Sequence, residues 1–149
     1  MIKGKVLIII SKYYKDISKN LLKSAITFLE EKFIKFDLIE VPGALEIPQA
    51  LNLQLNISKN TGFFYEGYIA LGCVIKGETY HFEIVSKETN RCLMNIALKY
   101  SCPLGNGIIT AYDYDQALKR SFNKGSEAAS ACYELIKIKD YNNKVDKFD

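Results

Sequence analysis

The 149-residue sequence has no tryptophan, a single histidine, three prolines and no long apolar run. A membrane-spanning helix needs about 18 or more consecutive apolar residues, so we expect no contact with a membrane. The four cysteines form no C-x-x-C pair and have no ligand-like spacing to the histidine. This pattern disfavours structural zinc and favours reduced thiols, and we therefore expect a metal-free protein in the cytoplasm.

The sequence also lacks a large excess of charge of either sign, because Lys and Arg total 20 against 17 Asp and Glu and the net charge is only +3. The basic residues are spread along the chain, whereas nucleic-acid-binding proteins gather them on one face, so we do not expect a nucleic-acid partner. The length and the 48% hydrophobic content suit one soluble domain. We predict that this domain covers residues 1–139 and that the polar segment 140–149 is a mobile tail.

Two kinds of apolar pattern alternate along the chain. Continuous β-branched runs such as Val6 to Ile10 are typical of strands covered on both faces, and apolar residues three to four apart are typical of helices. Strands are predicted at 6–10, 36–41, 67–75 and 104–110, and helices at 17–32, 47–55, 82–100, 115–120 and 128–136. Short connections between them predict right-handed βαβ units. We therefore expect an α/β fold, a flavodoxin-like three-layer α/β/α sandwich with a four-stranded, mainly parallel sheet.

Three unusual stretches follow predicted strands, SKYY at 11–14, VPGALEIP at 41–48 and VIKGETYH at 74–81. Ligands of an open parallel sheet bind at the carboxyl ends of its strands, which is where these stretches should lie. The turn from Lys76 to Thr79 opens a predicted helix, so its backbone N–H groups and the threonine hydroxyl can hold a phosphate. Alternatively, the glycine only makes the turn and the threonine only caps the helix.

Individual side chains in these stretches also have two interpretations. His81 lies in the first turn of the helix that follows the phosphate turn, where an imidazole can transfer protons, but a single histidine is often only a surface residue. Tyr13 can stack on a flat heterocycle or pack against its neighbours. Glu46 can accept hydrogen bonds from a polyol or an amine, or favour a helix N-terminus. The residues alone leave these alternatives open.

At these residues the sequence resembles a known family. VPGALEIP at 41–48 and ALGCVIKGETYHFEIV at 70–85 are similar to lumazine synthase, and the similarity continues through 105–110, 116–117 and 123–125. The resemblance implies an enzyme of riboflavin biosynthesis with two small-molecule substrates. It would condense 5-amino-6-(D-ribitylamino)uracil with 3,4-dihydroxy-2-butanone 4-phosphate and release 6,7-dimethyl-8-ribityllumazine, phosphate and water, without a cofactor or a metal.

The resemblance also implies a role for each candidate residue. His81 is the catalytic proton-transfer residue, and Tyr13 stacks on the pyrimidine. The residues implied to bind the ribitylaminouracil are Tyr13, Ala44, Leu45, Glu46, Cys73, Val74, Ile75 and Asn106. Those implied to bind the butanone phosphate are Gly77, Glu78, Thr79, Arg120 and Lys124. Because holding two reactants in register can supply much of the rate, we expect His81 to assist the reaction without being essential.

Two positions depart from the family's pattern and bear on assembly. Asn106 stands where many members carry an aromatic that reaches a neighbouring subunit's site, and an amide cannot stack on a ring. The segment 120–124 is shorter than usual, so either Arg120 or Lys124 can be the main phosphate cation. The resemblance implies a homopentamer with active sites between neighbouring subunits. The short segment disfavours an icosahedral shell, although a decamer or a shell stays compatible with the sequence.

Two other functions are compatible with the predicted fold. A flavin-binding carrier would also use a phosphate turn and a stacking tyrosine, but its phosphate loop should follow the first strand, where the stretch 11–14 is poor in Ser, Thr and Gly. The second is a scaffold or shell protein that keeps the fold without activity. Asn106 and the short 120–124 segment leave that outcome open.

Overall fold

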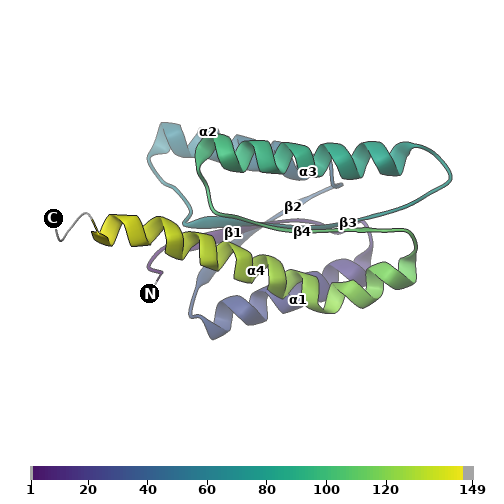
Figure 1. The fold of residues 1–149 in the computed structure, drawn as a ribbon, viewed down its shortest axis with the longest axis horizontal. Helices are drawn as coiled ribbons and strands as arrows, with labels where there is room; N and C mark the ends of the chain where they lie inside the picture. Colours follow the sequence, from purple (N-terminus) through teal and green to yellow (C-terminus); the bar gives the residue numbers. More distant parts are fainter. Residues whose placement is uncertain (1, 146–149) are drawn as a thin grey trace.

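The structure is a computed structural model that describes residues 2–145, in which strands and helices alternate along the chain (Figure 1). The strands are β1 (Lys5–Ser11), β2 (Lys35–Val41), β3 (Gly67–Ile75) and β4 (Leu104–Ala111), and the helices are α1 (Lys15–Glu31), α2 (Glu46–Thr61), α3 (His81–Tyr100) and α4 (Tyr114–Val145). Helices α2 and α3 lie on one side of the sheet, and α1 and α4 lie on the other (Figure 1).

The strands form one parallel sheet in the order β2-β1-β3-β4. The central strand β1 is covered on both faces, and each of its residues from Val6 to Ile10 is at most 1% exposed. Burial on both sides explains why this strand is a continuous apolar run without polar alternation. The predicted flavodoxin-like three-layer sandwich is confirmed.

Alternate residues of the central strands enter two separate cores, because successive strand side chains point to opposite faces. Val6, Ile8 and Ile10 pack into the core formed with α1 and α4. Leu7 and Ile9 pack into the core formed with α2 and α3. Each helical layer is therefore attached to the same strand through its own set of side chains.

Helix α4 differs from the prediction. The two helices predicted at 115–120 and 128–136 are parts of one continuous helix from Tyr114 to Val145. Gly125 lies between them, and a glycine inside a helix is usually destabilising. Here it lies against the backbone carbonyl of Leu21 in α1, where a Cβ atom would clash. Close packing on α1 thus accounts for a glycine in the middle of α4, and the predicted interruption is wrong.

The C-terminal part of the chain is described only in part. Helix α4 includes residues 140–145 of the predicted polar tail, while residues 146–149 lie outside the described residues. The mobility of this tail and the domain boundary at 139 stay predictions. Within residues 2–145, none of the helices combines the length and the apolar character that crossing a bilayer requires.

Candidate active site

A cleft of about 360 Å³ opens where β1, β2 and β3 end. Its wall combines the loop after β1, the loop after β2, the end of β3 and the start of α3. The lining residues are Tyr13, Tyr14, Gly43, Ala44, Leu45, Glu46, Cys73, Val74, Ile75, Gly77, Thr79, His81, Phe82 and Val85. The carboxyl ends of parallel strands are the expected place for a ligand in this type of sheet.

Most of the predicted site residues come together in this cleft. Of the residues implied to bind the ribitylaminouracil, only Asn106 is outside the lining. The phosphate turn contributes Gly77 and Thr79, while Glu78 is exposed in the same turn and does not line the cleft. Arg120 and Lys124 lie on α4, which covers the opposite face of the sheet from α3 (Figure 1). The cleft of one chain therefore lacks the two predicted phosphate cations.

Tyr14, Gly43, Phe82 and Val85 line the cleft but are not among the predicted site residues. Phe82 and Val85 follow the helical spacing that also marks a buried helix face, so their pattern does not distinguish a core position from a cleft position. Tyr14 directly follows the predicted stacking residue in the SKYY stretch, and Gly43 lies inside VPGALEIP. Position within a motif was thus the one available signal for these two.

The phosphate turn is held at its beginning and open in its middle. The Lys76 N–H donates a hydrogen bond to the carbonyl oxygen of Ala111 at 2.9 Å, which joins the turn to the end of β4. A Cβ atom placed on Gly77 would meet nothing within 4 Å. The His81 N–H lies 3.4 Å from the Thr79 hydroxyl oxygen, at the start of α3. The first N–H groups of a helix lack partners inside it, so this turn can bind an anion.

Tyr13 presents an open aromatic face. Its side chain is 73% exposed, and it is in contact with the neighbouring ring of Tyr14, with 5.0 Å between the ring centroids and 77° between the ring planes. This edge-on contact leaves much of the Tyr13 ring accessible to a second flat ring. The geometry is compatible with stacking of a heterocycle at the mouth of the cleft.

Glu46, the first residue of α2, lies close to Gly43 in the loop after β2. Its backbone N–H donates to the Gly43 carbonyl oxygen at 3.2 Å. A Cβ atom on Gly43 would lie 3.1 Å from Oε1 of Glu46, so the lack of a side chain at Gly43 makes room for this carboxylate. A carboxylate acceptor in the lining of the cleft suits the hydroxyl groups of a polyol.

The wall between Tyr14 and Cys73 is uncharged at neutral pH. Burial raises the pKa of the Cys73 thiol to about 12. Burial also raises the pKa of Tyr14, with smaller effects from the neighbouring Cys73 and Tyr13 groups. Both groups keep their protons near pH 7, so this part of the wall offers weakly polar donors and no reactive thiolate.

Asn106 has partners within its own chain. Its side-chain nitrogen donates to Oδ1 of Asn90 in α3 at 2.8 Å, and its side-chain oxygen accepts a hydrogen bond from the Ile108 N–H at 2.9 Å. It lies opposite Ala70 in the pairing of β3 and β4, away from the strand ends that form the cleft. In this arrangement Asn106 joins β4 to α3.

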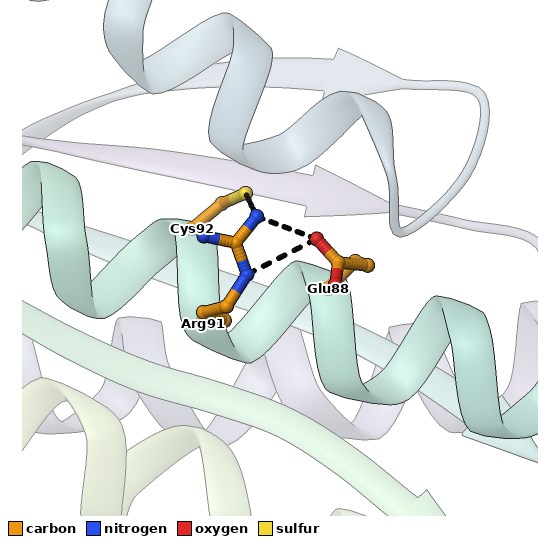
Figure 2. Close-up of polar contacts among 3 residues, drawn as sticks. All are labelled: Glu88, Arg91 and Cys92. Carbon is orange, nitrogen blue, oxygen red and sulfur yellow. Dashed lines mark hydrogen bonds and ion pairs between the residues drawn. The ribbon is translucent and has the colours of Figure 1, made fainter.

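Two other grooves of similar size lie elsewhere on the surface, one of about 390 Å³ between α1 and α4 and one of about 420 Å³ between α2 and α3. The second is lined in part by Glu88 and Cys92. Arg91 donates to the carboxylate of Glu88 at 2.6 and 3.1 Å and lowers its pKa, and it approaches the sulfur of Cys92 at 3.6 Å (Figure 2). The first groove contains no residue of the three strand-end stretches, and the second contains only Leu45 and Pro48, from one of them. The cleft brings all three stretches together and is therefore the candidate site.

The sequence is similar to known proteins of one family along most of its length. The sequence matches the family model for 6,7-dimethyl-8-ribityllumazine synthase over residues 3–140. A protein of this name from Afipia carboxidovorans is 46% identical over 140 residues, which cover 91% of this chain and 86% of the relative. One from Agrobacterium fabrum is 45% identical over 143 residues, which cover 93% and 97%. One from Bartonella henselae is 41% identical over 147 residues, which cover 96% and 93%.

Proposed function

Because the chain belongs to the 6,7-dimethyl-8-ribityllumazine synthase family, we propose that its cleft condenses 5-amino-6-(D-ribitylamino)uracil with 3,4-dihydroxy-2-butanone 4-phosphate. The protein is then a transferase-type condensing enzyme of riboflavin biosynthesis. The observation that carries the proposal is the meeting of Tyr13, Glu46, Thr79 and His81 in one cleft, although they come from three separate stretches that each follow a strand. Their chemistry suits a heterocycle, a polyol, a phosphate and a proton transfer.

The two substrates occupy different parts of the cleft in this proposal. The pyrimidine stacks on Tyr13, its ribityl chain binds to Glu46, and its polar edge meets backbone groups at the end of β3. The phosphate of the second substrate lies at the start of α3, where the helix dipole and the Thr79 hydroxyl favour an anion. Binding both molecules together converts a bimolecular reaction into an effectively unimolecular one.

The reaction proceeds by proton transfers that suit a single imidazole. The substrate amine attacks the ketone carbon, and loss of water gives a Schiff base. A proton leaves the adjacent, hydroxyl-bearing carbon as the C–O bond to phosphate breaks, which releases inorganic phosphate and leaves an enol. The enol takes a proton at its terminal carbon and loses its hydroxyl proton, which turns the hydroxyl-bearing carbon into a ketone. The ribitylamino nitrogen then attacks this new ketone, and loss of water closes the ring. His81, exposed at the first turn of α3 beside the phosphate turn, accepts and returns protons in these steps.

A homopentamer with sites between neighbouring subunits completes the proposal. Arg120, Lys124 and Asn106 lie outside the cleft of their own chain, so a neighbouring chain would bring a phosphate cation to it. Large apolar side chains are exposed on α2 and α3, where a second copy could cover them: Leu53, Ile57, Ile84, Met94 and Leu98. The short segment 120–124, which lies within α4, is the sequence feature on which we prefer the pentamer to a shell. The proposed location is the cytoplasm, where the four thiols stay reduced.

The decisive experiment supplies purified protein with both substrates and measures the fluorescent lumazine together with inorganic phosphate. Equal amounts of the two products, and neither product when one substrate is omitted, would support the enzyme. A yellow protein with stoichiometric bound FMN and no lumazine formation would instead identify a flavin carrier, and a colourless inactive protein would identify a scaffold. Light scattering should give a mass of five copies of the 16.9-kDa chain, and a much heavier particle would overturn the pentamer.

A further inference from the structure

Tyr14 lies in the wall of the cleft next to Tyr13 and Cys73. We propose that Tyr14 is a positioning residue for the ring of Tyr13, and that its hydroxyl and the Cys73 thiol form an uncharged end of the cleft that selects the heterocyclic substrate over the phosphorylated one. This inference rests on the proposed function. It adds a residue that discriminates between the two substrates.

The positioning role follows from how little else holds Tyr13. With 73% of its side chain exposed, the Tyr13 ring has few neighbours that could fix its orientation. The ring of Tyr14 supplies an edge-on contact, with 5.0 Å between ring centroids and 77° between ring planes, which is the arrangement that aromatic pairs favour. A ring that is oriented before the substrate arrives loses less conformational freedom on binding.

Tyr14 itself is well anchored. It is the N-cap residue of α1, and its carbonyl oxygen accepts a hydrogen bond from the Ser18 N–H at 2.9 Å. Its ring also contacts that of Tyr114, the first residue of α4, with a centroid distance of 6.5 Å and an angle of 64°. The Tyr114 hydroxyl in turn lies 3.5 Å from the carboxylate of Asp16. Tyr14 is thus held between the beginnings of two helices and can act as a fixed support.

The selection role follows from the chemistry of this end of the cleft. Among the residues that the structure describes, no hydrogen bond engages the side chain of Tyr14, so its hydroxyl is available to a ligand. Burial raises the pKa of both Tyr14 and Cys73, so both groups are neutral donors near pH 7. A phosphate placed against them would lose its hydration without gaining a cation, whereas a pyrimidine carbonyl would gain a hydrogen bond.

The test separates the ring of Tyr14 from its hydroxyl. Tyr14→Leu removes both and should raise the KM for the ribitylaminouracil about tenfold, with the KM for the butanone phosphate changed by less than about twofold. Tyr14→Phe keeps the supporting ring and should restore most of the loss, leaving a rise of about threefold for the missing hydroxyl. A change confined to one substrate is not expected from a residue that only stabilises the fold.

A matched control comes from a second edge-on pair far from the cleft. Tyr133 in α4 contacts the ring of Phe28 with a centroid distance of 6.0 Å and an angle of 68°, and it does not line the cleft. Tyr133→Leu therefore removes a similar ring contact and should leave both KM values unchanged. Equal changes in both KM values with Tyr14→Leu, or an effect no larger than that of Tyr133→Leu, would overturn the proposal.

The outcome can be distinguished from a failure of the proposed function. Absorbance titration of ribitylaminouracil alone measures binding without turnover, in wild type and in Tyr14→Leu. If wild type makes no lumazine, the proposed enzyme is wrong, and the titration still decides on Tyr14. Binding weakened about tenfold by Tyr14→Leu supports the role of Tyr14, and equal binding by the two proteins overturns it.

Discussion

The two helical layers differ in how closely they meet the rest of the molecule. In the layer of α1 and α4, glycines allow backbones to touch: a Cβ atom on Gly105 would clash with the carbonyl of Ala128, and one on Gly125 with that of Leu21. In the layer of α2 and α3, no glycine among residues 2–145 brings a helix backbone this close to another backbone. For this reason we call the layer of α1 and α4 the closed layer and the layer of α2 and α3 the open side, although both carry exposed large apolar side chains and a surface groove.

The cleft follows the same division. Beyond the strand ends, much of its wall comes from the beginnings of α2 and α3, and Tyr13 and Tyr14 are contributed by the loop before α1. The backbone contacts of α4 with β4 and α1 can hold the sheet in place while ligands bind in the cleft. Substitutions in the closed layer should therefore change stability, and substitutions at the open side should change binding and turnover.

The largest expected effect is that of Gly105→Ala in the closed layer. The new Cβ atom would occupy the place of a backbone carbonyl in α4, which cannot move without displacing the helix. We expect the free energy of unfolding to fall by about 3 kcal/mol, measured by chemical denaturation. Gly77→Ala is the matched control, because its Cβ atom would meet nothing within 4 Å. Similar losses in the two variants would contradict the contrast between the layers.

The fold could be predicted from the sequence because each pattern had a local cause. The continuous apolar run of β1 results from burial on both faces, and alternating strands and helices leave few parallel topologies. The interruption predicted in α4 was wrong because a glycine that packs on another helix has the same sequence signal as a helix end. The contact with Leu21 that explains Gly125 is far away in the sequence.

The site could be predicted where its residues share a motif and not where they depend on packing. The stretches 41–48 and 74–81 supplied most of the lining, since each directly follows a strand. Tyr14 was missed because adjacent tyrosines carry no signal for which of them faces a ligand. Arg120 and Lys124 lie on α4 outside the lining of the cleft, and a single sequence does not place the neighbouring chain that we propose would bring one of them to it.

The next effect in size concerns the open side, where His81→Ala should lower kcat about tenfold to a hundredfold without abolishing it. The remaining rate comes from holding both substrates in register. Because His81 is exposed at the first turn of α3, the free energy of unfolding should stay nearly unchanged. Steady-state kinetics and denaturation of the same preparation measure both quantities. Wild-type turnover would remove His81 from the reaction, and complete loss would make it essential.

A smaller effect on stability is expected from an unpaired polar group in the core between α3 and the sheet. Thr89 is 0% exposed, and within residues 2–145 its hydroxyl has no hydrogen-bond partner. Thr89→Val removes the unpaired hydroxyl and should raise the free energy of unfolding by about 1 kcal/mol. Thr27→Val in α1 is the control, because the Thr27 hydroxyl is exposed and donates to the Lys23 carbonyl oxygen at 2.8 Å. A loss of stability in Thr89→Val would show that this hydroxyl has a partner in solution.

The smallest effect is a pH dependence at the sheet edge beside α2. The Asp37 carboxylate accepts hydrogen bonds from the Tyr65 hydroxyl at 2.8 Å and from Nζ of Lys5 at 3.3 Å. The bond from Tyr65, with a smaller effect of Lys5, lowers the pKa of Asp37. Burial and the carboxylate raise the pKa of Tyr65 to about 12, so its hydroxyl stays a donor throughout the acid range.

A lowered pKa in the folded state means that the ionised Asp37 stabilises the fold above its unfolded pKa of about 3.9, and that this contribution is lost as the pH falls through the lower folded value. Wild type should therefore lose slightly more stability on acidification than Asp37→Asn, measured by urea denaturation at a series of pH values below 6. The difference should be small because the carboxylate is partly exposed. Tyr65→Phe should remove most of it, and if that variant keeps the full pH dependence, Lys5 and not Tyr65 is the main cause.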